Sequence, residues 1–330
     1  MRTIESLRVF LSPLTNERIG KRICEIAAPL KVVPILANAT CDLNGVDADI
    51  AFISRDVTGT STKHQIEVPL QRFYAGLASS PALKWVHLHS AGKDRPIVSE
   101  LERRGVAVTA SAGANAEIVA QTALGGILSL GRRFPQLRRA QGDRLWKPLI
   151  KDKLPPDLRG QTAVIVGWGP VGQQIAAYLG MLGIQNIAVR TTNQSTPGTL
   201  QTVQFSDISQ VLGLADWLIL ACPLSDTTHH LIGFNSFAKM KPDSYLINVA
   251  RGEVVVEAEL IKALEQRLIA GAYLDVFEHE PLPTHSPLWD APNVIITPHT
   301  AGHSEGNERR VDEIFLTRLE DFSSRLHRVT

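Results

Sequence analysis

The sequence lacks the features that mark several classes of protein. Its three cysteines have no CxxC spacing and leave one unpaired in any disulfide scheme, which favours a reducing compartment. Its net charge is only +1, with no basic or acidic block, so neither nucleic acid nor an anionic membrane is an expected partner. No stretch approaches the ~20 apolar residues of a membrane span, and no apolar signal segment opens the chain. We therefore expect a cytoplasmic protein.

A glycine-rich loop near the middle of the chain carries the first positive signal. The chain has 330 residues and is 44% hydrophobic, which is long enough for two domains. The loop, Gly167-Trp168-Gly169-Pro170-Val171-Gly172, follows a β-branched run at 162–166 and precedes a helical pattern at 173–182. A GxGxxG loop alone is weak evidence. Strand, glycine turn and helix together predict a loop that brings a pyrophosphate to a helix N-terminus.

Strand and helix patterns alternate on both sides of this loop. Strand candidates before it are 8–12, 31–35, 49–54, 84–90 and 106–111; those after it are 187–189, 217–221, 244–248, 271–275 and 294–297. A long helix is expected at 115–138, a loop at 151–160, and a last helix at about 308–326. This alternation predicts an α/β protein with parallel sheets covered on both faces.

Three short sequence motifs after the glycine loop indicate which reaction the protein catalyses. Arg251 lies in Asn248-Val249-Ala250-Arg251-Gly252, Glu280 in Asp275-Val276-Phe277-Glu278-His279-Glu280-Pro281, and His299 in Thr297-Pro298-His299. A guanidinium can bind a substrate carboxylate and polarise the neighbouring carbonyl. An imidazole can supply the proton, and a carboxylate can hold that imidazole. These are the groups that reduction of a 2-keto acid requires. Glu278 and Glu257 compete with Glu280 as the partner of His299.

Two histidines four residues apart, His299 and His303, raise the question of a metal site. Such a pair binds a metal when both side chains lie on one helix, and Pro298 and Gly302 argue against a helix here. No cysteine or carboxylate cluster completes a ligand set, so we predict no metal.

The end of the second strand of the nucleotide domain indicates which cofactor is used. NAD-specific domains place an acid there, ~20 residues after the glycines, to bind the ribose hydroxyls. This chain has Arg190, followed by Thr191 and Thr192, at that place. A guanidinium and hydroxyls suit a 2′-phosphate. We predict NADP as the preferred cofactor, with NAD possible; the alternative is that Arg190 faces solvent or stacks on the adenine and either cofactor is accepted.

The chain resembles the D-isomer-specific 2-hydroxyacid dehydrogenase family, in particular glyoxylate/hydroxypyruvate reductases. The resemblance covers most of the chain. It rests on the glycine loop, the three motifs that contain Arg251, Glu280 and His299, and two further segments, Ser90-Ala91-Gly92-Lys93-Asp94 and Pro223-Leu224-Ser225-Asp226-Thr227-Thr228. It implies two doubly wound parallel-sheet domains and a homodimer. One is a discontinuous, flavodoxin-like substrate domain at 1–112 plus 300–330, and the other is a central Rossmann domain at 113–299. Gln121 departs from the Glu that the family often has in its dimer-forming helix.

The resemblance also implies roles for individual residues. It selects Glu280, which precedes Pro281, as the partner of His299, and it implies that Ala91 and Gly92 offer amides to the substrate carboxylate. Arg55 could face the same cleft or have a plain surface role, and Trp146 could lie at the dimer interface or in the core. The implied cofactor contacts are Gly167, Gly169, Pro170, Val171, Gly172, Cys222, Pro223, Thr228, Val249, Ala250, Asp275 and Gly302. Asp275 would accept from the nicotinamide carboxamide.

The leading hypothesis is therefore an oxidoreductase that transfers a hydride from NADPH to a small 2-keto acid such as glyoxylate or hydroxypyruvate. Two alternatives stay open. A non-catalytic, dinucleotide-sensing protein would share the fold, although Arg251, Glu280 and His299 are all present. A formate dehydrogenase-like enzyme would have Gln in place of Glu280.

Overall fold

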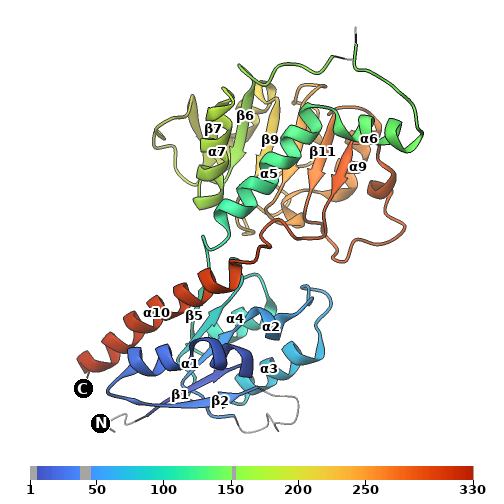
Figure 1. The fold of residues 1–330 in the computed structure, drawn as a ribbon. Helices are drawn as coiled ribbons and strands as arrows, with labels where there is room; N and C mark the ends of the chain where they lie inside the picture. The colour runs from blue at the N-terminus through green and yellow to red at the C-terminus, as the bar shows by residue number, and fades with distance from the viewer. Residues whose placement is uncertain (1–5, 38–45, 151–153, 330) are drawn as a thin grey trace. The chain divides into compact units, whose positions relative to one another are not determined.

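The structure is a computed structural model that describes residues 6–37, 46–150 and 154–329. Cys41, the first five residues and part of the loop predicted at 151–160 lie outside this description. The chain divides into two compact units, Met1–Ala114 with Ser304–Thr330 (unit 1) and Asn115–His303 (unit 2). Figure 1 shows the course of the chain through each of them. The substrate-binding and dinucleotide-binding roles of these units remain predictions.

Unit 1 is built on a parallel sheet. Within the described residues the strand order is β2-β1-β3-β4-β5, the order of flavodoxin-like folds. The strands are β1 (Ser6–Leu11), β2 (Lys31–Leu36), β3 (Ile50–Ile53), β4 (Trp85–Leu88) and β5 (Ala107–Ala110). The helices are α1 (Pro13–Ala27), α2 (Arg55–Thr58), α3 (Val68–Ala78), α4 (Pro96–Arg103) and α10 (Asn307–Val329).

The C-terminal helix α10 packs into the core of unit 1. Phe315 stacks on Phe52 of β3 with ring centroids 4.5 Å apart and on Trp85 of β4 at 5.4 Å. Arg18 of α1 donates to Asp312 of α10 at 3.0 Å. Aromatic stacking thus packs α10 against the sheet of unit 1, and the ion pair joins α10 to α1.

Unit 2 is a second, larger parallel sheet. In the part of the chain that is described its order is β12-β11-β10-β9-β6-β7-β8, which is the Rossmann order with an added strand. The strands are β6 (Thr162–Val166), β7 (Gln185–Arg190), β8 (Gln201–Gln204), β9 (Trp217–Leu220), β10 (Tyr245–Asn248), β11 (Gly271–Leu274) and β12 (Val294–Ile296). The helices are α5 (Ala116–Gly131), α6 (Phe134–Gly142), α7 (Pro170–Met181), α8 (Phe234–Phe237) and α9 (Glu257–Glu265).

The predicted α/β fold with two doubly wound sheets is confirmed, with three local corrections. The helix expected at 115–138 is broken, because Arg133 has a left-handed φ of 57° and Pro135, which lacks an N–H, lies in the first turn of α6. The polar edge strand β8 was not predicted. Arg190 is the last residue of β7 rather than the first residue after it.

Candidate active site

The glycine loop after β6 is shaped by close backbone contacts. Gly167 has a φ of +100°, and a Cβ there would lie 2.6 Å from the Cα of Cys222. A Cβ on Gly172 would lie 2.0 Å from the carbonyl oxygen of Gly167. Side chains are therefore excluded at both positions.

Gly169 differs, because nothing lies within 4 Å of its Cβ position. It caps the N-terminus of α7, Pro170 is the first residue of that helix, and no side chain caps its amides. The loop thus leaves open space in front of unsatisfied helix amides, as a bound pyrophosphate requires.

Arg190 is half-buried at the end of β7, and Thr191 and Thr192 are exposed beside it. No hydrogen bond or ion pair joins the Arg190 guanidinium to any other residue that the structure describes. No acid stands at 190–193. The end of β7 therefore presents a positive charge and two hydroxyls.

In the segment after β9, the side chains of Thr228 and Cys222 are buried in the protein. Thr228 is buried, and its hydroxyl donates to the carbonyl of Pro223 at 2.7 Å and accepts from the amide of Ser225 at 2.8 Å. Burial raises the pKa of the Cys222 thiol to about 12. The Thr228 side chain therefore shapes the loop, and burial of Cys222 favours its neutral thiol.

Arg251 lies in a tight turn after β10. Asn248 is buried; its Oδ1 accepts from the amide of Ala250 and its Nδ2 donates to the carbonyl of Arg251, each at 3.1 Å. A Cβ on Gly252 would lie 1.9 Å from the carbonyl carbon of Phe277. The turn therefore packs against the segment that carries Glu280. Asn248 was not predicted as a site residue, although it belongs to the same sequence motif as Arg251.

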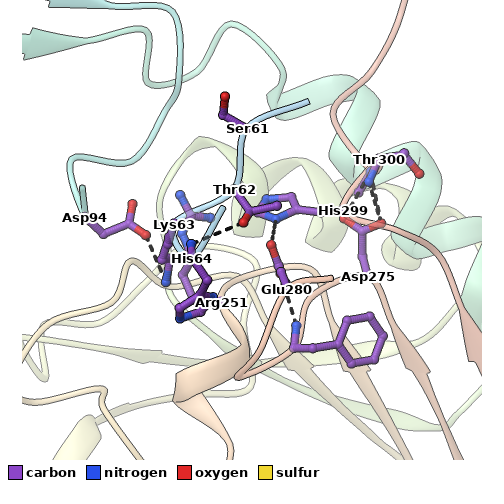
Figure 2. Close-up of polar contacts among 12 residues, drawn as sticks. Ser61, Thr62, Lys63, His64, Asp94, Arg251, Asp275, Glu280, His299 and Thr300 are labelled. Atoms are coloured by element: carbon purple, nitrogen blue, oxygen red, sulfur yellow. Dashed lines mark hydrogen bonds and ion pairs between the residues drawn. The ribbon is translucent and has the colours of Figure 1, made fainter. Parts of the chain in front are cut away.

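His299 and Glu280 are in direct contact (Figure 2). The Nδ1 of His299 lies 2.7 Å from Oε2 of Glu280, whose Oε1 accepts from the amide of Phe277 at 3.2 Å. The carboxylate is 13% exposed and the imidazole 46%. A partly buried carboxylate thus holds one ring nitrogen and leaves Nε2 for a ligand.

The two competing acids are engaged elsewhere. Glu278 accepts from the amide of Glu257 at 3.1 Å, and Glu257 accepts from the amide of Glu278 at 3.2 Å. Of the three candidates, Glu280 is the one that the structure joins to His299.

Asp275 anchors the loop that presents His299. It is 2% exposed, and its carboxylate accepts from the amides of Thr300 and Ala301 at 2.9 and 3.0 Å and from the hydroxyl of Thr297 at 2.6 Å (Figure 2). Its carbonyl accepts from the amide of His299 at 2.8 Å. These bonds hold His299 at its unusual φ of +51°. This positioning role was missed, and the predicted bond to the nicotinamide carboxamide remains a prediction.

In unit 1, the loop after β4 contains Ala91 and Gly92. Their amides donate to no acceptor among the described residues, while Ser90 donates through its hydroxyl to the carbonyl of Gly92 at 2.9 Å. Arg55 is half-buried at the start of α2. Trp146 is 97% exposed, so the alternative that it packs in the core is wrong.

Comparison with known proteins identifies the family. A family model described as "D-isomer specific 2-hydroxyacid dehydrogenase, NAD binding domain" matches residues 124–301. The glyoxylate reductase of Thermofilum pendens is 34% identical over 246 residues, which cover 73% of this chain and 72% of that protein. The chain belongs to the D-isomer-specific 2-hydroxyacid dehydrogenase family.

Solved structures of this family have the same fold. A family protein from Aeromonas salmonicida aligns with a TM-score of 0.77 and 28% identity over 96% of both chains. The NADPH-dependent glyoxylate/hydroxypyruvate reductase of Sinorhizobium meliloti, solved with NADP and malonate, aligns with a TM-score of 0.72 and 28% identity over 95% of this chain and 92% of its own. The chain is accordingly an NAD(P)-dependent D-2-hydroxyacid dehydrogenase.

The described residues include no group of three or more His, Cys, Asp or Glu that could hold a metal ion. None of the helices seen in these ranges is long and apolar enough to cross a membrane.

Proposed function

We propose that the protein reduces a small 2-keto acid, such as glyoxylate or hydroxypyruvate, to the D-2-hydroxy acid with NADPH. The contact between His299 and Glu280 carries this proposal, because it pairs a proton donor with the carboxylate that holds it. The names of the relatives from Thermofilum pendens and Sinorhizobium meliloti support the substrate.

The catalytic residues divide the work as follows. The nicotinamide, when bound, supplies the hydride. Arg251 binds the substrate carboxylate and stabilises the negative charge that develops on the keto oxygen. The Nε2 of the His299 imidazolium donates a proton to that oxygen. Glu280 bonds Nδ1 and favours the imidazolium.

We assign substrate binding to a discontinuous domain at 1–112 plus 300–330 and dinucleotide binding to 113–299. The amides of Ala91 and Gly92 would bind the substrate carboxylate, and the space at Gly169 would hold the pyrophosphate. Pro170, Val171, Pro223, Val249, Ala250 and Gly302 complete the proposed cofactor contacts.

A second copy of the chain is the proposed protein partner. Large apolar side chains are exposed along the segment that follows α5, among them Phe134, Leu145, Trp146 and Ile150. Such a run is unusual on a free surface and suits a dimer interface. Light scattering should give the mass of a dimer, and Trp146→Asp should shift the protein toward monomer. A monomeric wild-type protein would contradict the assignment.

Nicotinamide absorbance tests the proposed activity directly. We expect the purified protein to oxidise NADPH on addition of glyoxylate or hydroxypyruvate and to yield the D-isomer where the product is chiral. His299→Gln should retain nucleotide binding and lose turnover. A protein that binds NADPH but reduces no 2-keto acid would favour the dinucleotide-sensing alternative.

A further inference from the structure

We propose that the hydroxyl groups of Tyr273 and Thr297 position the imidazole of His299 for proton transfer. They act through the carboxylate of Asp275, so both are positioning residues. The inference deepens the proposed function and rests on it. It assigns a role to Tyr273, which lies in none of the sequence motifs, and to Thr297, whose motif was singled out for its histidine.

The parallel sheet of unit 2 brings these side chains together. Leu274 of β11 is paired with Ile296 of β12, and the amide of Thr297 donates to the carbonyl of Leu274 at 3.0 Å. Successive side chains of a strand point to opposite faces, so residues two apart share a face. Tyr273, Asp275 and Thr297 therefore lie on one face of the sheet, where the two strands end.

Two hydroxyl groups and a carboxylate form a chain of short hydrogen bonds on this face. The phenolic oxygen of Tyr273 lies 2.7 Å from Oγ1 of Thr297, which donates to Oδ1 of Asp275 at 2.6 Å. The same Oδ1 accepts from the amide of Thr300 at 2.9 Å (Figure 2), and Oδ2 accepts from the amide of Ala301 at 3.0 Å. The chain thus joins the buried part of β11 to the backbone of the loop that carries the catalytic imidazole.

The donors and acceptors fix the direction of this chain. Oδ1 of Asp275 accepts from a backbone amide, which can only donate, and it accepts from the hydroxyl of Thr297 as well. A threonine hydroxyl has one hydrogen, so toward Tyr273 it can only accept. Burial raises the pKa of Tyr273 to about 12, and the phenol therefore keeps the hydrogen that it donates. Each bond polarises the next one toward the carboxylate.

The ring of Tyr273 is fixed by the helix that covers it. Tyr273 is 3% exposed, and a Cβ on Gly126 of α5 would lie 2.6 Å from its Cγ. The absence of a side chain at Gly126 lets the helix backbone lie directly on the ring. A ring held in this way presents its hydroxyl at one place, so Thr297 receives the hydrogen bond without a further loss of side-chain entropy.

His299 needs this support because its backbone conformation is costly. Its φ of +51° lies in the left-handed region, which a residue with a side chain keeps only where its surroundings enforce it. The amide of His299 donates to the carbonyl of Asp275 at 2.8 Å, while Thr297 and Thr300 on either side bond the carboxylate of Asp275. Loss of one of these bonds should let the loop leave the conformation that presents the imidazole.

Two substitutions that conserve shape test the proposal in kcat with glyoxylate. The value is expressed per titrated NADPH site, so a smaller folded fraction cancels. Thr297→Val removes a hydrogen bond to a charged group and should lower kcat about tenfold. Tyr273→Phe removes a bond between neutral groups and should lower kcat about threefold. Thr297→Ser keeps the hydroxyl and should retain most of the wild-type kcat. NADPH affinity should change little in all three, since the glycine loop and Arg190 are untouched.

The direction of the chain predicts how the two changes combine. In Thr297→Val the hydroxyl of Tyr273 has already lost its acceptor in the chain. Adding Tyr273→Phe to that variant should therefore lower kcat no further, whereas independent positions would multiply their effects. Multiplied losses in the double variant would contradict the proposed chain.

Matched controls make the same chemical changes at the other end of the strands. Thr162→Val and Tyr245→Phe alter the first residues of β6 and β10 and should leave kcat unchanged. Three results would overturn this inference alone: wild-type kcat in Thr297→Val, an equal loss in Thr297→Ser, or a fall in NADPH affinity as large as the fall in kcat. A wild type that reduces no 2-keto acid would overturn the proposed function as well.

Discussion

Replacement of Arg190 by Asp should reverse the cofactor preference. The guanidinium lies half-buried at the end of β7 beside the exposed Thr191 and Thr192. A charged hydrogen bond to the 2′-phosphate contributes ~1.5–3 kcal/mol. A carboxylate placed there adds repulsion of ~1 kcal/mol, the value for a solvated pair at 4 Å. Because the site is partly solvated we take the lower end, ~2.5 kcal/mol, which corresponds to a roughly 60-fold change.

The assay is steady-state kinetics with NADPH and NADH at one 2-keto acid concentration. The ratio of the two kcat/KM values should exceed one in the wild type and fall roughly 60-fold in Arg190→Asp, by the energies above. Arg267→Asp makes the same charge change before β11, at the other end of the strands, and should leave the ratio unchanged. A wild type that prefers NADH, or an unchanged ratio in Arg190→Asp, would show that Arg190 does not determine the cofactor preference.

Three further predictions follow from the geometry. Glu280→Gln should shift the alkaline limb of reductive activity to lower pH, because reduction requires the imidazolium of His299, which loses its counter-charge; Glu278→Gln is the control, and coincident pH profiles would remove Glu280 from its role. Gly172→Ala should abolish nucleotide binding in a calorimetric titration, since its Cβ would lie 2.0 Å from the Gly167 oxygen, whereas Gly180→Ala, with open space around it, should bind normally. Burial lowers the pKa of His87 to about 3 from an unfolded value near 6.5. Its contribution to stability is present above pH 6.5 and is lost as pH falls toward 3, by up to ~5 kcal/mol. The protection factors of β4 amides against hydrogen exchange should therefore fall in acid more in the wild type than in His87→Gln, and an equal fall in both proteins would contradict this.

Much of the fold can be predicted from the sequence because the central strands are buried on both faces. β3 and β9 are continuous apolar runs with every residue buried, the pattern of parallel strands. The edge strand β8, with the sequence Gln-Thr-Val-Gln, has no such pattern. The break between α5 and α6 depends on a left-handed arginine, Arg133, which helix propensity does not predict.

The catalytic candidates can also be predicted from the sequence, because Arg251, Glu280 and His299 lie in short local motifs. The residues that hold these side chains in place cannot be predicted in this way. The positioning role of Asp275 depends on bonds to Thr297, Thr300 and Ala301, 22 to 26 residues away, and only the folded sheet brings these partners together. The choice of Glu280 over Glu278 likewise needed the family pattern, because spacing alone does not distinguish the two acids.

In the proposed function, His299 is the proton donor of a 2-keto acid reductase. The most direct test is the rate of NADPH oxidation with glyoxylate by wild type and His299→Gln, with NADPH affinity measured in parallel. We predict robust turnover in the wild type and, in the variant, a loss of at least about a hundredfold in kcat, as removal of a general acid gives, with NADPH affinity unchanged. A variant that turns over at the wild-type rate would contradict the claim.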